Sequence, residues 1–110
     1  MSIMLRIRDI IFDKWRERKE ESSVTRKEYA EAFLTARAAK KTEPLDWRRS
    51  VVDLLKVLDE DSSLQARQKL ADELGYEGDL DESHTMNAWL HAAVMRDVER
   101  GEFEESAPAR

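Results

Sequence analysis

Apolar residues recur at intervals of three and four along most of this chain, the spacing that places them on one face of an α-helix. A clear stripe of this kind lies near the C-terminal end and consists of Met86, Trp89, Leu90, Ala93, Val94 and Val98. No segment alternates between apolar and polar residues over a useful length, and no internal repeat is visible. The sequence therefore predicts an all-α protein, a bundle of about five helices.

The first two predicted helices are separated by a polar break. The first runs to about Arg18, and its apolar stripe is formed by Ile3, Met4, Ile7, Ile10, Ile11 and Trp15. Thr25 and Glu28 then form a capping box that opens a second helix, which ends at about Lys40 because Pro44 cannot continue it. The apolar stripe of this second helix consists of Tyr29, Ala32, Phe33 and Ala36.

Helix signals also divide the middle of the chain. Asp46 is expected to cap a third helix that ends near Asp59. Its apolar stripe consists of Trp47, Val51, Leu54, Leu55 and Leu58. Ser62 and Gln65 have the spacing of a second capping box, and Gly75 stands where a left-handed C-terminal cap is expected.

Charge is distributed unevenly along the chain. Residues 1–44 contain 11 basic and 8 acidic side chains, whereas residues 45–110 contain 8 basic and 16 acidic ones. An acidic domain repels nucleic acid phosphates, so direct nucleic acid binding is not expected. We predict an N-terminal amphipathic helix over residues 1–21, a helical domain over 25–101 and an acidic, disordered tail over 102–110.

The absence of cysteine excludes a disulfide framework, a thiolate metal site and a cysteine nucleophile. Charged residues interrupt the apolar start of the chain, so neither a signal peptide nor a membrane-spanning helix is expected there. We expect a soluble, cytoplasmic protein without a cofactor.

The basic amphipathic start is the first candidate binding surface. Arg6 and Arg8 lie among the apolar residues Ile7, Ile11 and Trp15, a pattern that suits an anionic membrane surface or a groove on a protein partner. The other interpretation is that this stripe packs against the rest of the bundle, as amphipathic helices of small proteins commonly do.

An acidic loop before the last helix is the second candidate. Asp79, Asp81 and Glu82 are expected to contact a basic partner or to imitate nucleic acid, although a run of charges is usually only a solvated surface. Arg48 and Arg49 lie in the first turn of a predicted helix, where the helix dipole disfavours cations. The acidic loop is expected to compensate them.

Catalytic and metal-binding patterns are weak. His84 and His91 are two helical turns apart, with Asn87 between them, so the two imidazoles do not converge on one ion. An enzyme that uses His91 with Asp97 remains the alternative from another class. The two acidic loops lack the glycine and glutamate of a calcium loop, and the turn after Gly75 is too long for a DNA-reading helix pair.

Four stretches together resemble a known family: LDWRRSVVDLLK (45–56), DSSLQAR (61–67), LADELGY (70–76) and MNAWLH (86–91). They are similar to the small bacterial family catalogued as domain of unknown function three-five-nine-seven, and the opening MSI also resembles its N-terminus. The resemblance implies a compact, monomeric helical domain with a buried last helix and no established activity. Relatives usually carry an Ala- and Pro-rich linker where residues 16–23 are short and charged here.

These observations favour a non-enzymatic interaction module that binds a protein partner. The alternatives are an acidic inhibitor that occupies the nucleic-acid-binding surface of a partner, and peripheral membrane association through residues 1–19.

Overall fold

The computed structural model describes residues 2–13 and 25–100, which form five helices and, within these ranges, no strand. The helices are α1 (Ile3–Phe12), α3 (Arg26–Ala39), α4 (Val51–Val57), α5 (Leu64–Glu73) and α6 (Ser83–Arg100). The predicted all-α bundle of about five helices is therefore confirmed. The tail predicted for 102–110 and the second half of the N-terminal helix predicted for 1–21 lie outside the described residues.

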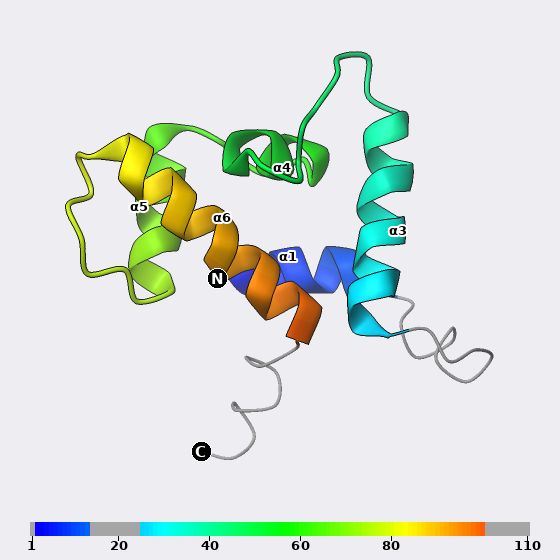
Figure 1. Cartoon of the computed structure of the whole chain (residues 1–110), viewed down its shortest axis with the longest axis horizontal. Coiled ribbons are helices and arrows are strands. Elements are labelled where there is room, and N and C mark those ends of the chain that lie inside the picture. The colour runs from blue at the N-terminus through cyan, green and yellow to red at the C-terminus, as the bar shows by residue number, and fades with distance from the viewer. Residues whose placement is uncertain (1, 14–24, 101–110) are drawn as a thin grey trace.

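Helix α6 is the element around which the other helices gather. It contacts α3, α4 and α5, and its long diagonal course is visible in Figure 1. Met86, Leu90, Val94 and Val98 recur every four residues on its inner face, and each is at most 1% exposed. The C-terminal helix is thus buried along one side, as predicted.

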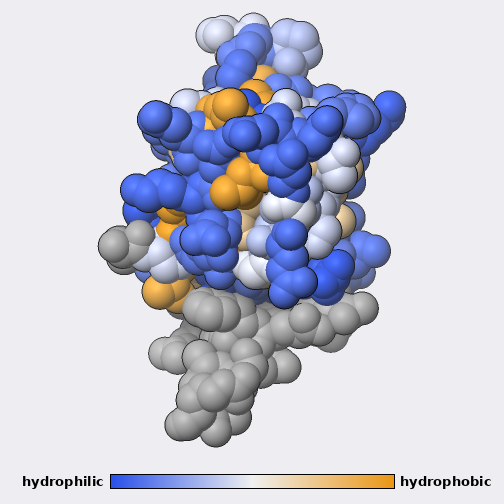
Figure 2. Space-filling model, turned by 90° about the vertical axis from the view of Figure 1, so that its left-hand side faces the viewer, coloured by the Kyte–Doolittle hydropathy of each residue, from blue (hydrophilic) through white to orange (hydrophobic). Residues whose placement is uncertain are grey.

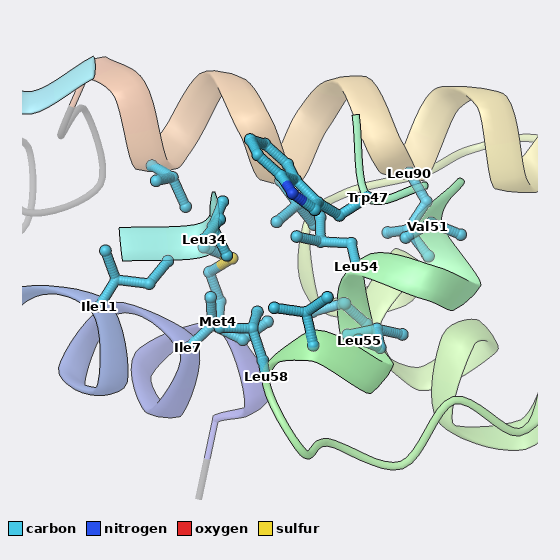
Figure 3. Close-up of a cluster of buried hydrophobic side chains, with 14 of the residues drawn as sticks. Met4, Ile7, Ile11, Leu34, Trp47, Val51, Leu54, Leu55, Leu58 and Leu90 are labelled. Carbon is cyan, nitrogen blue, oxygen red and sulfur yellow. The ribbon is translucent and has the colours of Figure 1, made fainter. Parts of the chain in front are cut away.

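Helix α1 contributes its apolar stripe to the same core. Met4, Ile7 and Ile11 are at most 1% exposed and lie close to Leu34 of α3 and Leu58 at the end of α4 (Figure 3). The structure supports the second interpretation of the N-terminal stripe, in which the stripe packs against the rest of the bundle. In the part of the chain that the structure describes, no helix is both long and apolar enough to cross a membrane.

Local signals set most helix ends. Thr25 and Glu28 form the predicted capping box, with Glu28 N donating to Thr25 Oγ1 at 3.1 Å and Thr25 N donating to Glu28 Oε1 at 3.0 Å. Gly75 has a φ of 93°. Tyr76 N bonds Ala71 O and Gly75 N bonds Asp72 O, the paired hydrogen bonds of a Schellman cap.

Two predicted caps are wrong. Ser50, not Asp46, caps α4, because Asp46 belongs to a separate turn that is closed by a hydrogen bond of 2.9 Å from Ser50 N to Asp46 O. Ser63, not Ser62, caps α5, and the main chain of Ser63 is itself fixed by Asp61 Oδ1 at 2.9 Å. The predicted pair of Ser62 with Gln65 is therefore not a capping box.

The second helix turns a different face to the core than its sequence suggested. Ala30 and Leu34 are its fully buried residues. Tyr29 and Phe33 of the predicted stripe are half-buried, and Ala32 and Ala36 are exposed. Because α3 carries apolar residues on more than one face, it fills the core with one face and leaves apolar surface on another.

Hydrogen exchange tests whether α1 is part of the cooperative core. We expect the amides of Ile7–Ile11 to exchange with a free energy within about 1 kcal/mol of that for Leu54–Leu58, because both segments are buried in one cluster. Native-state exchange of the intact chain, followed residue by residue, measures both. Exchange of the α1 amides by orders of magnitude faster than those of α4 would show that α1 opens separately.

Candidate functional site

The described residues of the N-terminal candidate surface point toward the rest of the bundle. Ile7 and Ile11 are 0% and 1% exposed. Arg8 is buried with its Nε 3.7 Å from Asp97 Oδ1, a nearly buried carboxylate of α6. Arg6 binds Glu60 through Nη2 at 2.9 Å and Nε at 3.2 Å, and this hydrogen-bonded ion pair raises the pKa of Arg6. A partner could reach Ile7 and Ile11 only if α1 left the core; Trp15 lies outside the described residues.

The start of α1 is tied to α5 by one carboxylate. Glu73 accepts from Ile3 N at 3.1 Å, from Met4 N at 3.0 Å and from the hydroxyl of Ser2. A negative charge at this end also suits the helix dipole. Glu73 therefore supplements the cap that Ser2 provides through its bond from Leu5 N.

The acidic loop lies at the end of the molecule where α5 and α6 meet (Figure 1). We define the acidic edge as Asp72, Glu77, Asp79, Asp81 and Glu82, all of which are exposed. Hydrophilic residues cover most of this side of the molecule in Figure 2. Within the described residues, no cation is paired with any of these carboxylates.

Three contacts hold the loop that carries this edge. Gln68 Nε2 donates to Leu80 O at 2.9 Å, and Asp81 N donates to Asp79 Oδ1 at 2.9 Å. The rings of Tyr76 and Trp89 pack with centroids 4.9 Å apart. The carboxylates are therefore presented from a loop that is anchored to both neighbouring helices.

The two arginines that were expected to pair with this loop take other partners. Arg48 Nη1 is 3.6 Å from Glu31 Oε2, and its guanidinium lies 4.3 Å from the centre of a Trp47 ring. Arg49 pairs with Asp46 at 3.5 Å. The predicted compensation by the acidic loop is wrong, because α3 and the turn before α4 provide nearer carboxylates.

The histidines do not form a common site. His91 Nε2 lies 2.8 Å from Trp47 O, and Asn87 Oδ1 accepts from Arg67 Nη1 at 2.8 Å. His84 is exposed beside a cavity of about 250 Å³. No group of three or more His, Asp or Glu side chains in the described ranges is arranged to hold a metal ion. Asp97, the carboxylate considered with His91, faces Arg8.

A cavity on α3 was not anticipated from the sequence. It has a volume of about 360 Å³, and the described residues that line it are Tyr29, Ala32, Phe33, Ala36, Arg37 and Lys40. We call this surface the α3 groove. Its signal in the sequence is the presence of two apolar faces on one helix, the second one containing Ala30 and Leu34.

One aspartate links α3 to the end of α4. Asp59 occupies the left-handed position after α4, with a φ of 58°, where a glycine is usually found. Its carboxylate accepts from Lys41 Nζ and from Arg37 Nη2, and these hydrogen bonds lower the pKa of Asp59.

Five helices around one core, with no converging catalytic groups in the described ranges, define a small all-α domain. The chain belongs to the family described as domain of unknown function (DUF3597), whose sequence model matches residues 7–102. The resemblance seen in the sequence is thereby confirmed.

A solved structure supports the same fold. The solution structure of a conserved unknown protein from Rhodopseudomonas palustris is 34% identical, with a TM-score of 0.67. The similarity covers 89% of this chain and 90% of that protein. No curated protein matches this chain.

Variants of Arg8 and Asp97 test whether this ion pair helps to hold α1 against α6. We expect Asp97→Leu or Arg8→Met alone to lower the free energy of unfolding by about 2 to 4 kcal/mol, because each removes one member of a nearly buried ion pair. The double variant should lose less than the sum of the two. Urea denaturation of all four proteins measures this, and strictly additive losses would mean that the two side chains are not coupled.

Asp59 predicts an acid-sensitive contact. Because its folded pKa is lowered, the stabilisation it provides is present above the ordinary aspartate pKa, about 4, and is lost as the pH falls through the folded value. We expect Asp59→Asn to lower Tm at pH 6 and to reduce the fall in Tm between pH 6 and pH 3. Asp9→Asn, at an exposed site, is the control; an unchanged pH dependence in Asp59→Asn would contradict the assignment.

Proposed function

We propose that the chain is a non-enzymatic interaction module that binds a protein partner, and that the acidic edge meets a basic surface of that partner. The observation that carries this proposal is a cluster of exposed carboxylates without cationic partners in the described structure, on a loop anchored to α5 and α6. Such a cluster attracts a basic surface over a distance of roughly 10 Å at 0.1 M salt.

The anchoring of the loop makes the acidic edge suitable for binding. A loop that is already fixed loses less conformational entropy when a partner binds. Asp81 N donates a hydrogen bond to the Asp79 carboxylate, and the carbonyl of Leu80 between them accepts one from Gln68. The main chain that carries the acidic edge is therefore held in place before a partner binds.

Its non-enzymatic character is supported by the other contacts of the candidate catalytic groups. His91 lies against a main-chain carbonyl, and Asp97 faces Arg8. A general acid or base needs access to a substrate in a cleft. These contacts suit structural roles, and the absence of cysteine suits a reducing compartment such as the cytoplasm.

The same acidic edge is compatible with an inhibitor that occupies a nucleic-acid-binding surface. Residues 72–82 contain six acidic and no basic side chains, so this end of the molecule resembles nucleic acid in the sign of its charge. The identity of the captured partner decides between a general protein contact and inhibition of this kind.

Charge neutralisation tests the proposal. The edge variant carries Asp79→Asn, Asp81→Asn and Glu82→Gln, and the control carries the same loss of charge at the exposed sites Asp9→Asn, Asp13→Asn and Glu43→Gln. After crosslinking in the cells of origin and affinity purification, we expect a partner that the edge variant recovers about tenfold less than the unmodified chain and the control do. Its affinity, measured with purified proteins, should fall as salt rises.

Two results of this experiment would contradict the proposal. Recovery of the same proteins in the same amounts by the edge variant, or an affinity that is flat between low and high salt, would exclude the acidic edge as the binding surface. Circular dichroism of both variants confirms that their folding is unchanged.

A further inference from the structure

The α3 groove is lined by residues of α3 and by Lys40 directly after it, and α3 lies at the opposite end of the molecule from the loop that joins α5 to α6 (Figure 1). Its apolar members Tyr29, Ala32, Phe33 and Ala36 have the spacing i, i+3, i+4 and i+7. They therefore form one line along a single helix face, and this line is about two turns long. The surface is distinct from the residues that carry the proposed function.

The shape of the groove suits another helix. Ala32 and Ala36 are exposed and small, so a second main chain can approach closely there. Tyr29 and Phe33 are half-buried beside them. Tyr29 is held by stacking on Phe12 of α1, with ring centroids 5.7 Å apart and an interplanar angle of 21°. The exposed small residues therefore lie next to partly buried aromatic rings.

The charges of the groove have one sign. Arg37 and Lys40 are the charged side chains among the described residues that line it, and no described carboxylate does so. Arg37 is fixed, since its Nε donates to Val57 O at 2.8 Å and its Nη2 to Asp59 at 2.7 Å. Asp59 is shared with Lys41, so the group of Arg37, Lys41 and Asp59 keeps a net positive charge, and Lys40 adds a second.

We propose that the α3 groove binds an acidic amphipathic helix of a protein partner. The apolar side chains of that helix would cover Ala32 and Ala36, and its carboxylates would meet Lys40 and Arg37. The cationic lining is the reason for choosing an acidic helix. Two copies of the groove placed face to face would bring cations together without a groove carboxylate to balance them.

Two synthetic peptides test the proposal on the full chain. Each is an amphipathic helix with leucines at i, i+3, i+4 and i+7, one flanked by glutamates and the other by lysines. Titration into the ¹⁵N-labelled protein should shift the amide signals of α3, and the glutamate peptide should bind there at least about tenfold more tightly than the lysine peptide.

Matched variants locate the contact. Ala36→Glu places a carboxylate inside the groove, whereas Thr35→Glu places the same side chain at the neighbouring exposed position outside it. We expect Ala36→Glu to weaken the glutamate peptide by about tenfold or more and Thr35→Glu to change it less than about twofold. Because both sites are exposed and glutamate is a good helix former, both variants should fold.

Several outcomes would overturn the proposal. Equal α3 binding of both peptides would show that charge does not select the occupant, and the absence of shifts in α3 up to about 1 mM peptide would show that the groove binds no such helix. Sedimentation velocity tests whether a second copy of the chain occupies the groove instead. A concentration-dependent dimer that Ala36→Glu abolishes and Thr35→Glu does not would assign the groove to a second copy of the chain.

Discussion

Burial of the inner face of α6 is the constraint on which the rest of the bundle depends. Helix α1 has 10 residues and α4 has 7, whereas an isolated helix in water is marginal below roughly 12 to 15 residues. Neither is therefore expected to persist without the core it shares with α6. Each fully buried Leu, Ile, Val or Met contributes roughly 1.5 to 3 kcal/mol, so several such side chains per helix offset the cost of ordering it.

The features that could be predicted from the sequence depend on residues close together in the chain. The helical period, the capping box of Thr25 with Glu28 and the left-handed cap at Gly75 are all local. The stripe of α1 was also visible, but whether it is buried depends on what packs against it. Its burial beside Leu34 and Leu58 is a property of the assembled bundle, which is why the sequence left two interpretations open.

What the sequence did not predict depends on residues far apart in the chain. Arg8 meets Asp97, which is 89 positions away in the sequence, and Arg48 meets Glu31 of α3. Which face of α3 is buried depends on its packing against α1, α4 and α6, and not on the sequence of α3 alone. A helix with apolar residues on two faces leaves one of them outside, and the period alone does not say which. The α3 groove could not be found without that choice.

The fold separates the basic and the acidic segments of the chain in space. Residues 25–41, which contain α3, have five basic and two acidic side chains, whereas residues 72–82 have no basic and six acidic ones. In the folded chain, α3 lies at one end and the acidic edge at the other (Figure 1). Interactions between exposed charges fade over roughly 8 Å at physiological salt, so charges at opposite ends do not neutralise each other. Each end keeps its own sign, and a partner at one end leaves the charge at the other unchanged.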